Sequence, residues 1–445
     1  MTLDQQMLAA LRALWAIPAP GPRSLQSAPA FMELSKLCET RYGRGAARFA
    51  LSTALRSLGL PCTLPAVHAN LAQDPEQAAL ALDAAFTQTR CVRRHMCPLD
   101  LADDLPPLAF GPVRVGRFSA DELARLFDAP RLARNFPAKP LDTVGLAQFH
   151  WLVVEEDIEI DPRPEARSIP ALFMDMSRDV GEIDPHLGRF PQSVEAALFF
   201  LLLAPWEAWS TMLEVDWRGF RLPWIYTIDE DLFSWPKPPP NPDSLSLEPW
   251  IVQDHDGEDI ELERPTTFPL VDEAKAGLSR CTEAAWTALR TARATDLFET
   301  PIAHFLVRAF LADGMDEVMA HMTAIEAAVG MEADHRKKLL PKTAPHRDLS
   351  ATDRVAARVA GLLDDPASAQ LYKDLFELRS AFVHGRAGLQ KVSTPQQVSA
   401  RELARRTARA LVDVAQDGRP RSDAMAGLLD KGVAVLAASK AKGSP

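Results

Sequence analysis

The fold of this chain is decided by one stretch near its C-terminus, Leu371-Tyr372-Lys373-Asp374-Leu375-Phe376-Glu377-Leu378-Arg379-Ser380-Ala381-Phe382-Val383-His384-Gly385. Its apolar residues recur at the spacing of one helix face: Leu371, Leu375, Leu378 and Phe382. That face must pack against a core, so the stretch predicts a helix inside a bundle. Gly385 is expected to end this helix, because glycine suits the left-handed conformation that follows a helix C-terminus.

Two side chains of this helix, Arg379 and His384, lie off the apolar face and are available for chemistry. On an ideal helix, residues five apart point in directions that differ by roughly 140°. One regular helix therefore does not hold a substrate between these two side chains. Either the end of the helix is distorted, or a second chain completes the site.

The segment Arg379-Ser380-Ala381-Phe382-Val383-His384-Gly385 resembles the Arg-x4-6-His motif of the HEPN superfamily, in the style of its Apea-like branch. Upstream, Met322-Thr323-Ala324-Ile325-Glu326-Ala327-Ala328 resembles the Ala-x-Glu-containing first long helix of that family. The resemblance covers residues 300–420. Residues 97–118 resemble, more weakly and only in general sequence character, the region that often precedes this module.

The resemblance implies a C-terminal all-α HEPN bundle that forms homodimers and cuts RNA without metal or cofactor. The implied catalytic residues are Arg379 and His384, with Ser380 and Glu326 in support. His384 would serve as general acid or base, and Arg379 would stabilise charge on the phosphate. Many family members carry a polar amide where this chain has Ser380. Glu326 is expected either to orient Arg379 or His384, or to be an ordinary polar or ion-paired residue.

Basic residues around the motif are expected to contact RNA phosphates. They are Arg386, Lys391, Arg401, Arg405 and Arg409. The last three repeat every four residues, which places them on one face of a helix. The alternative for this face is an ordinary solvated helix surface.

The whole chain, of 445 residues, carries a net charge of −11, which argues against coating of nucleic acid along its full length. The acidic excess lies in the first 300 residues, whereas basic residues outnumber acidic ones afterwards. Five cysteines, an odd number at irregular spacing, favour a reducing cytoplasm. The N-terminus lacks the pattern of a signal peptide, and the apolar run 196–206 is too short to span a bilayer. We therefore expect a cytoplasmic protein without membrane contact.

The fold class expected is α+β, with the helical bundle preceded by a helical region and a Trp-rich region that contains β-strands. The predicted domains are residues 1–135, 136–270 and 271–440. A strand is expected over 149–160, β-structure over 217–228, and a hairpin over 250–263 with its turn at Asp256-Gly257. The helices expected in the bundle cover 272–294, 302–329 with a break near Gly314, 352–363, 369–384, and 401–415 behind a capping box at 399–402. A last helix is expected after Gly432.

We therefore predict a HEPN-type endoribonuclease acting in antiviral defence or toxin-like growth arrest. A regulatory protein or ligand is expected at the N-terminal or middle region. The alternative is a non-catalytic HEPN scaffold that dimerises or binds RNA or protein, with sensing in the middle domain. A sensor would be favoured by a ligand pocket lined by Trp206, Trp217, Trp224 and Trp235. A zinc site at residues 91–97 is disfavoured because no second ligand pair follows.

Overall fold

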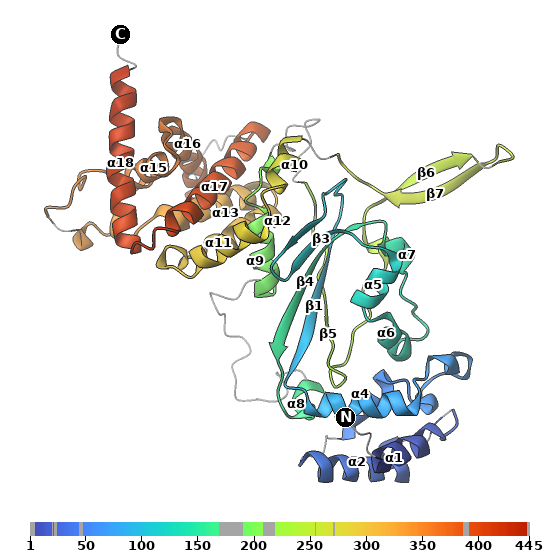
Figure 1. Ribbon diagram of the computed structural model, residues 1–445. Coiled ribbons are helices and arrows are strands. Elements are labelled where there is room, and N and C mark those ends of the chain that lie inside the picture. The colour runs from blue at the N-terminus through green and yellow to red at the C-terminus, as the bar shows by residue number, and fades with distance from the viewer. Residues whose placement is uncertain are drawn as a thin grey trace. The chain divides into compact units, whose positions relative to one another are not determined.

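The computed structural model describes residues 5–19, 21, 25–43, 48–168, 190–207, 219–253, 255–269, 272–340, 342–385 and 391–442. The chain folds into two compact units. One unit comprises residues 1–100, 116–183 and 223–266, and the other comprises residues 101–115, 184–222 and 267–445. Strands and helices are mixed in the first unit, and the C-terminal part of the second is helical (Figure 1). The predicted α+β class with a helical C-terminal region is therefore confirmed.

The first unit is built on an antiparallel sheet. Strand β1 (Arg90–Leu99) lies between β4 (His150–Glu159) and β5 (Tyr226–Asp229), which confirms the predicted strand over 149–160. Three short helices supply apolar side chains to a core with this sheet: α5 (Ala120–Leu126), α6 (Ala129–Asn135) and α7 (Thr143–Leu146). Trp151 of β4 is fully buried in that core.

The N-terminal helices of this unit share a second apolar core. They are α1 (Gln5–Trp15), α2 (Pro29–Tyr42), α3 (Arg48–Ser57) and α4 (Pro75–Thr87). The expectation that the first 130 residues are mostly helical is wrong for β1 and for the hairpin of β2 (Leu108–Phe110) and β3 (Val113–Arg117). Strand β1 is rich in charge because its arginines pair across strands: Arg93 Nε lies 2.7 Å from Asp229 Oδ1. This pairing is invisible in one strand alone.

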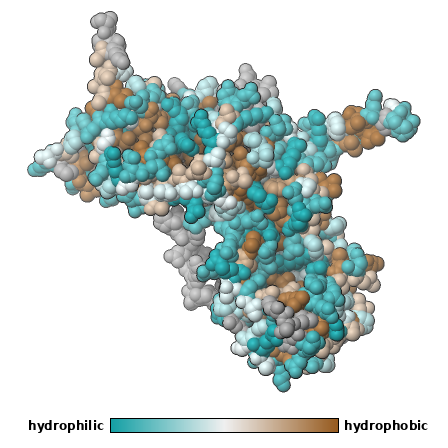
Figure 2. Space-filling model, in the orientation of Figure 1, coloured by the Kyte–Doolittle hydropathy of each residue, from teal (hydrophilic) through white to brown (hydrophobic). Residues whose placement is uncertain are grey.

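The predicted hairpin is confirmed as β6 (Leu247–Gln253) and β7 (Asp259–Pro265), with Gly257 in the left-handed region of the turn (φ 83°). Side chains of Trp250, Ile260 and Leu262 on it are exposed, and Figure 2 shows apolar surface along this arm. Of the region predicted as β-structure over 217–228, residues 217 and 218 lie outside the described residues. A short helix, α8 (Pro164–Ser168), completes the described elements of the unit.

The second unit contains most of the helices. They are α9 (Gln192–Leu201), α10 (Asp272–Leu278), α11 (Glu283–Arg293), α12 (Ile302–Leu311), α13 (Gly314–Val329), α14 (Glu332–His335), α15 (Ala351–Leu363), α16 (Pro366–Val383), α17 (Thr394–Ala415) and α18 (Arg421–Lys442). The predicted break near Gly314 is confirmed. The single helix predicted over 272–294 is wrong: the chain breaks after Leu278, and the Thr282 side chain caps α11 by accepting a hydrogen bond from Ala285 N.

Two later helices begin earlier than predicted. Helix α17 starts at Thr394, because Ser393 and Gln396 form the capping box and a proline occupies the first turn. The box expected at 399–402 is therefore wrong, and those residues lie inside the helix. Helix α18 already runs through Gly432, which packs against α15.

The division into two units differs from the three consecutive domains predicted. Strand β1 belongs to the predicted N-terminal domain, whereas its partners β4 and β5 belong to the predicted middle domain. Those two regions therefore share one sheet. The start of the last segment of the second unit, residue 267, is close to the predicted boundary at 271. Among the described helices, none is both long and apolar enough to cross a membrane.

Candidate functional site

Helices α13 and α16 bring Glu326 and Arg379 together within the second unit. Arg379 Nη1 donates a hydrogen bond of 3.0 Å to Glu326 Oε1, and both side chains are partly exposed, by 28% and 25%. The hydroxyl of the buried Tyr372 lies 3.5 Å from the same oxygen. Glu326 therefore does contact Arg379, and the guanidinium is held in place without being fully enclosed.

The Arg379 guanidinium retains donor capacity beyond this ion pair. Its Nε is buried and has no hydrogen-bond partner among the residues that the structure describes. The Phe376 ring lies 5.8 Å from the guanidinium carbon, close enough for a cation–π contact. The side chain is 28% exposed, so the part of the guanidinium that faces solvent can still meet an acceptor such as a phosphate oxygen.

His384 follows the last residue of α16 and is exposed. Its backbone N–H still donates to Ser380 O at 3.0 Å, so the helix is not distorted between Arg379 and His384. Gly385 adopts a left-handed conformation (φ 59°), as predicted for the helix end. Within the described part of the chain, the Ser380 hydroxyl makes no hydrogen bond. A regular helix leaves the directions of Arg379 and His384 roughly 140° apart.

The apolar face of α16 is buried at its start and exposed at its end. Leu375 is 1% exposed, whereas Phe382 is 43% and Val383 52% exposed. The prediction that the whole face, Phe382 included, packs against a core is therefore wrong at the end near His384. An exposed pair of large apolar residues beside the candidate catalytic histidine is a feature of contact surfaces.

Burial raises the pKa of the Glu326 carboxyl above its ordinary value, against the opposing effects of Arg379, His335 and the Tyr372 hydroxyl. The folded chain therefore binds this proton more tightly than the unfolded chain does. The stabilisation that follows is present at low pH and is lost as the pH rises through the raised pKa. On acidification, Glu326 therefore loses its negative charge at a higher pH than an ordinary glutamate does. The ion pair with Arg379 is lost at the same pH.

We expect the Glu326→Gln variant to lack this pH dependence and to hold Arg379 through a neutral, weaker hydrogen bond. The measurement is a pH titration of the glutamate carboxyl carbons by NMR in the full chain. One carboxyl should titrate above the ordinary range and disappear from the spectrum of the variant. If every glutamate titrates in the ordinary range, burial does not raise the pKa of Glu326 in the folded chain.

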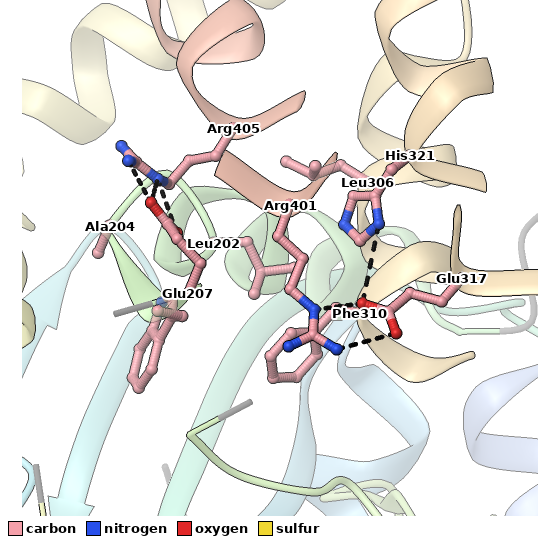
Figure 3. A pocket seen from close by; sticks show the side chains of 10 residues that line it. Leu202, Ala204, Glu207, Leu306, Phe310, Glu317, His321, Arg401 and Arg405 are labelled. Atoms are coloured by element: carbon pink, nitrogen blue, oxygen red, sulfur yellow. Dashed lines mark hydrogen bonds and ion pairs between the residues drawn. The ribbon is translucent and has the colours of Figure 1, made fainter. Parts of the chain in front are cut away.

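The basic face predicted on α17 is not a solvated surface. Arg401 is 6% exposed, and its Nη2 lies 2.9 Å from an oxygen of Glu317, which is fully buried on α13 (Figure 3). The expectation that Arg401 contacts RNA phosphate is wrong, because α13 packs on this face and its buried carboxylate requires a cation.

The remaining residues expected to contact RNA differ in their surroundings and exposure. Arg405 Nε donates to both carboxylate oxygens of Glu207, at 2.7 and 2.9 Å, so this arginine too is committed to an acid (Figure 3). Arg409 is half-buried and lines a pocket, and Lys391 is exposed. Arg386 lies outside the described residues. Of the expected RNA contacts in the described chain, Lys391 alone is fully exposed and therefore keeps the predicted setting.

The two ion pairs of α17 border a small pocket of about 30 Å³. His321 lies beside it, with Nδ1 3.9 Å from the Glu317 carboxylate (Figure 3). The pocket is otherwise lined by apolar residues of α12 and of the turn after α9. Because each guanidinium is matched by a carboxylate, the charge of this pocket is balanced. The pocket is best explained as a gap within the bundle.

No group of three or more potential metal ligands occurs among the described residues. His95 lies in the segment 91–97 considered above for zinc. Its Nδ1 lies 2.8 Å from the Thr227 hydroxyl, and its Nε2 lies 3.1 Å from a Glu156 carboxylate oxygen. Of the tryptophans suggested to line a sensor pocket, Trp206 belongs to the second unit and Trp224 and Trp235 to the first. Trp217 lies outside the described residues.

Two partners of the predicted residues, one at this site and one on the α17 face, were not anticipated from the sequence. Tyr372 precedes Arg379 by seven residues, a spacing that places both on one side of a helix, and this signal could have identified it. Glu207 is separated from Arg405 by 198 residues, and no local pattern links them.

The candidate site thus consists of a held guanidinium and an exposed imidazole at one end of α16. Its residues come from three consecutive turns of one helix and from the end of α13. Membership of the HEPN superfamily stays a prediction from the motif, since no family model, curated protein or solved structure matches this chain.

Proposed function

We propose that this protein is a metal-independent endoribonuclease of HEPN type, in which Arg379 and His384 act on RNA. The observation that carries the proposal is the Arg379 guanidinium, held by Glu326 and still 28% exposed, five residues before an exposed histidine. This combination supplies a phosphate ligand and an acid–base group on one rigid helix end.

In the proposed reaction the ribose 2′-oxygen attacks the adjacent phosphorus. The bond from phosphorus to the 2′-oxygen forms as the bond to the 5′-oxygen of the next nucleotide breaks. A neutral His384 accepts the proton of the 2′-hydroxyl, and a protonated His384 gives a proton to the departing 5′-oxygen. Arg379 binds the phosphate oxygens while their charge grows. The products are a 2′,3′-cyclic phosphate and a 5′-hydroxyl.

The proposed active form is a homodimer that joins the ends of two α16 helices. A regular helix directs Arg379 and His384 apart, so a second copy is needed to surround one phosphate and to supply a second imidazole. Exposed Phe382 and Val383 adjoin this end and favour an interface there. In this proposal the Ser380 hydroxyl donates a hydrogen bond near the phosphate.

The setting inferred for this activity is the cytoplasm, in antiviral defence or toxin-like growth arrest, as the motif resemblance implies. All five cysteines are free and buried, which is compatible with a reducing compartment. The first unit is proposed to receive the regulatory protein or ligand.

The direct test is incubation of the purified chain with RNA and with DNA of the same sequence in excess EDTA. RNA should be cut and DNA left intact, because DNA lacks the attacking hydroxyl. Cleavage that requires a divalent cation, or that affects DNA equally, would rule out the proposed chemistry.

The second candidate is a non-catalytic scaffold that dimerises and binds RNA or protein. It is favoured by the Arg379–Glu326 ion pair, which also occurs as an ordinary structural contact between helices. This alternative predicts RNA binding without strand cleavage and no toxicity when the protein is overproduced. Toxicity that is lost in the His384→Ala variant would exclude it.

A further inference from the structure

A second pocket of the helical unit lies between the segment after α9, the end of α10 and helix α17. Its volume is about 380 Å³. Phe200, Leu203 and Pro205 line it on the apolar side. This volume is in the range of pockets that hold small organic molecules.

Two arginines in this pocket, Arg280 and Arg409, have no carboxylate partner among the described residues. Arg280 is exposed, and Arg409 is half-buried. The other charged groups lining the pocket are Arg405, which is paired with Glu207, and Glu273. Arginines therefore outnumber carboxylates here, and the pocket attracts an anion.

The contrast with the rest of α17 makes Arg409 unusual. Arg401, Arg405 and Arg406 of the same helix each lie within ion-pair distance of a carboxylate. Arg409 has no such partner among the described residues and lines the pocket, so its guanidinium is available to bind an anion there.

Away from the charged side chains, the wall of the pocket between α10 and the segment after α9 is closely packed and apolar. A Cβ atom on Gly277 would lie 2.2 Å from Pro205 Cδ, so glycine is required where α10 meets the segment after α9. Burial raises the pKa of the Cys281 thiol to about 11, which keeps this neighbour of Arg280 neutral. A planar or apolar group can therefore rest on Pro205 and Ala276, the more accessible apolar residues of the lining, while an anionic group faces the arginines.

We propose that this pocket binds a small organic phosphate monoester, with its phosphate between Arg280 and Arg409 and its apolar body against Pro205 and Ala276. Guanidinium groups bind phosphate oxygens in pairs, and a monoester carries nearly two negative charges at neutral pH. This binding goes beyond the ribonuclease proposal and does not depend on it, since neither Arg379 nor His384 lines the pocket.

The test is calorimetric titration of the full chain with phenyl phosphate, in comparison with phenol and with inorganic phosphate. Phenyl phosphate should bind saturably at one site, and each half-ligand should bind at least about tenfold more weakly, since each lacks one contact surface. The Arg280→Gln and Arg409→Gln variants should each weaken binding by roughly ten- to a hundredfold.

Arg406→Gln is the matched control, because Arg406 lies on the same helix but does not line the pocket. Its affinity for phenyl phosphate should equal that of the unaltered chain. Since Arg280 is exposed, its substitution leaves the fold intact even if Arg409→Gln does not. Absence of saturable binding, an unchanged affinity in Arg280→Gln, or an equal loss in Arg406→Gln would each overturn the proposal.

Competition identifies the source of the phosphate. Nucleoside 5′-monophosphates and uncleavable 2′-O-methyl oligonucleotides, with and without a 5′-phosphate, are titrated against phenyl phosphate. Displacement by the mononucleotides alone would assign a free metabolite, whereas displacement by the 5′-phosphorylated oligonucleotide would assign an RNA end. Both results support a monoester site, and failure of every competitor and of phenyl phosphate itself contradicts it.

Discussion

The His384→Ala variant is expected to lose RNA cleavage by about a hundred- to ten-thousandfold, the contribution typical of a general acid or base. Its fold should be unchanged, because the side chain is exposed and makes no hydrogen bond within the described residues. The measurement is the initial rate of RNA cleavage in EDTA, with the thermal midpoint taken on the same samples.

The matched control is His255→Ala, which removes an equally exposed imidazole from the turn between β6 and β7. This variant should cleave at the rate of the unaltered chain. If His384→Ala cleaves at that rate as well, the histidine has no chemical role. If both variants fail alike, the loss does not report on His384, and the assigned role is again contradicted.

The second large effect is expected on the stability of the helical unit, where α15 packs against α18. Helices α15 and α18 cross with their backbones in contact, and a Cβ atom on Gly432 would lie 1.7 Å from Ala357 O. Gly361 on α15 is equally confined, by Leu428 O at 2.2 Å. Because the obstacle is backbone, no side chain can move aside, so α15 and α18 must separate to admit a methyl group.

Gly432→Ala should therefore lower the free energy of unfolding by about 3 kcal/mol, at the upper end of overpacking effects. Gly427→Ala on the same helix is the control, since nothing lies within 4 Å of its added Cβ. The control should raise the free energy of unfolding by about 0.5–1 kcal/mol, through the better helix propensity of alanine. Urea unfolding measures both. Equal effects of the two substitutions would mean that α15 and α18 do not cross here.

The parts of the site that the sequence could predict are those set by local periodicity. Spacing along residues 371–385 predicted helix α16, its glycine end at Gly385 and the position of Arg379 away from the apolar face. The pairing of Arg379 with Glu326 was anticipated as one of two alternatives. Each of these follows from the helical repeat or from the motif.

The parts that could not be predicted depend on which distant segment packs against a given face of a helix or strand. Arg401 and Arg405 occupy one face of α17 whether that face meets solvent or the buried carboxylates of Glu317 and Glu207. Helical spacing does not distinguish these cases, because the acids come from distant segments. Strand β1 was missed for the same reason, since its charges are matched by carboxylates such as Asp229 on neighbouring strands.

The exposure of the end of α16 could not be predicted for the same reason. Periodicity assigns Phe382 to the apolar face, but among the described residues Phe382 is left 43% exposed. Helical spacing alone does not show where along its length a face is covered. In the proposed dimer, this end of α16 beside His384 is where the second copy would pack.

The measurement that tests the central claim most directly is mass spectrometry of the fragment ends made from a defined RNA in excess EDTA. Attack by the 2′-hydroxyl, assisted by Arg379 and His384, predicts fragments ending in a 2′,3′-cyclic phosphate and fragments beginning with a 5′-hydroxyl. Fragments that carry a 5′-phosphate and a 3′-hydroxyl would mean that water attacked instead. That result would contradict the assignment of this helix end as a HEPN-type active site.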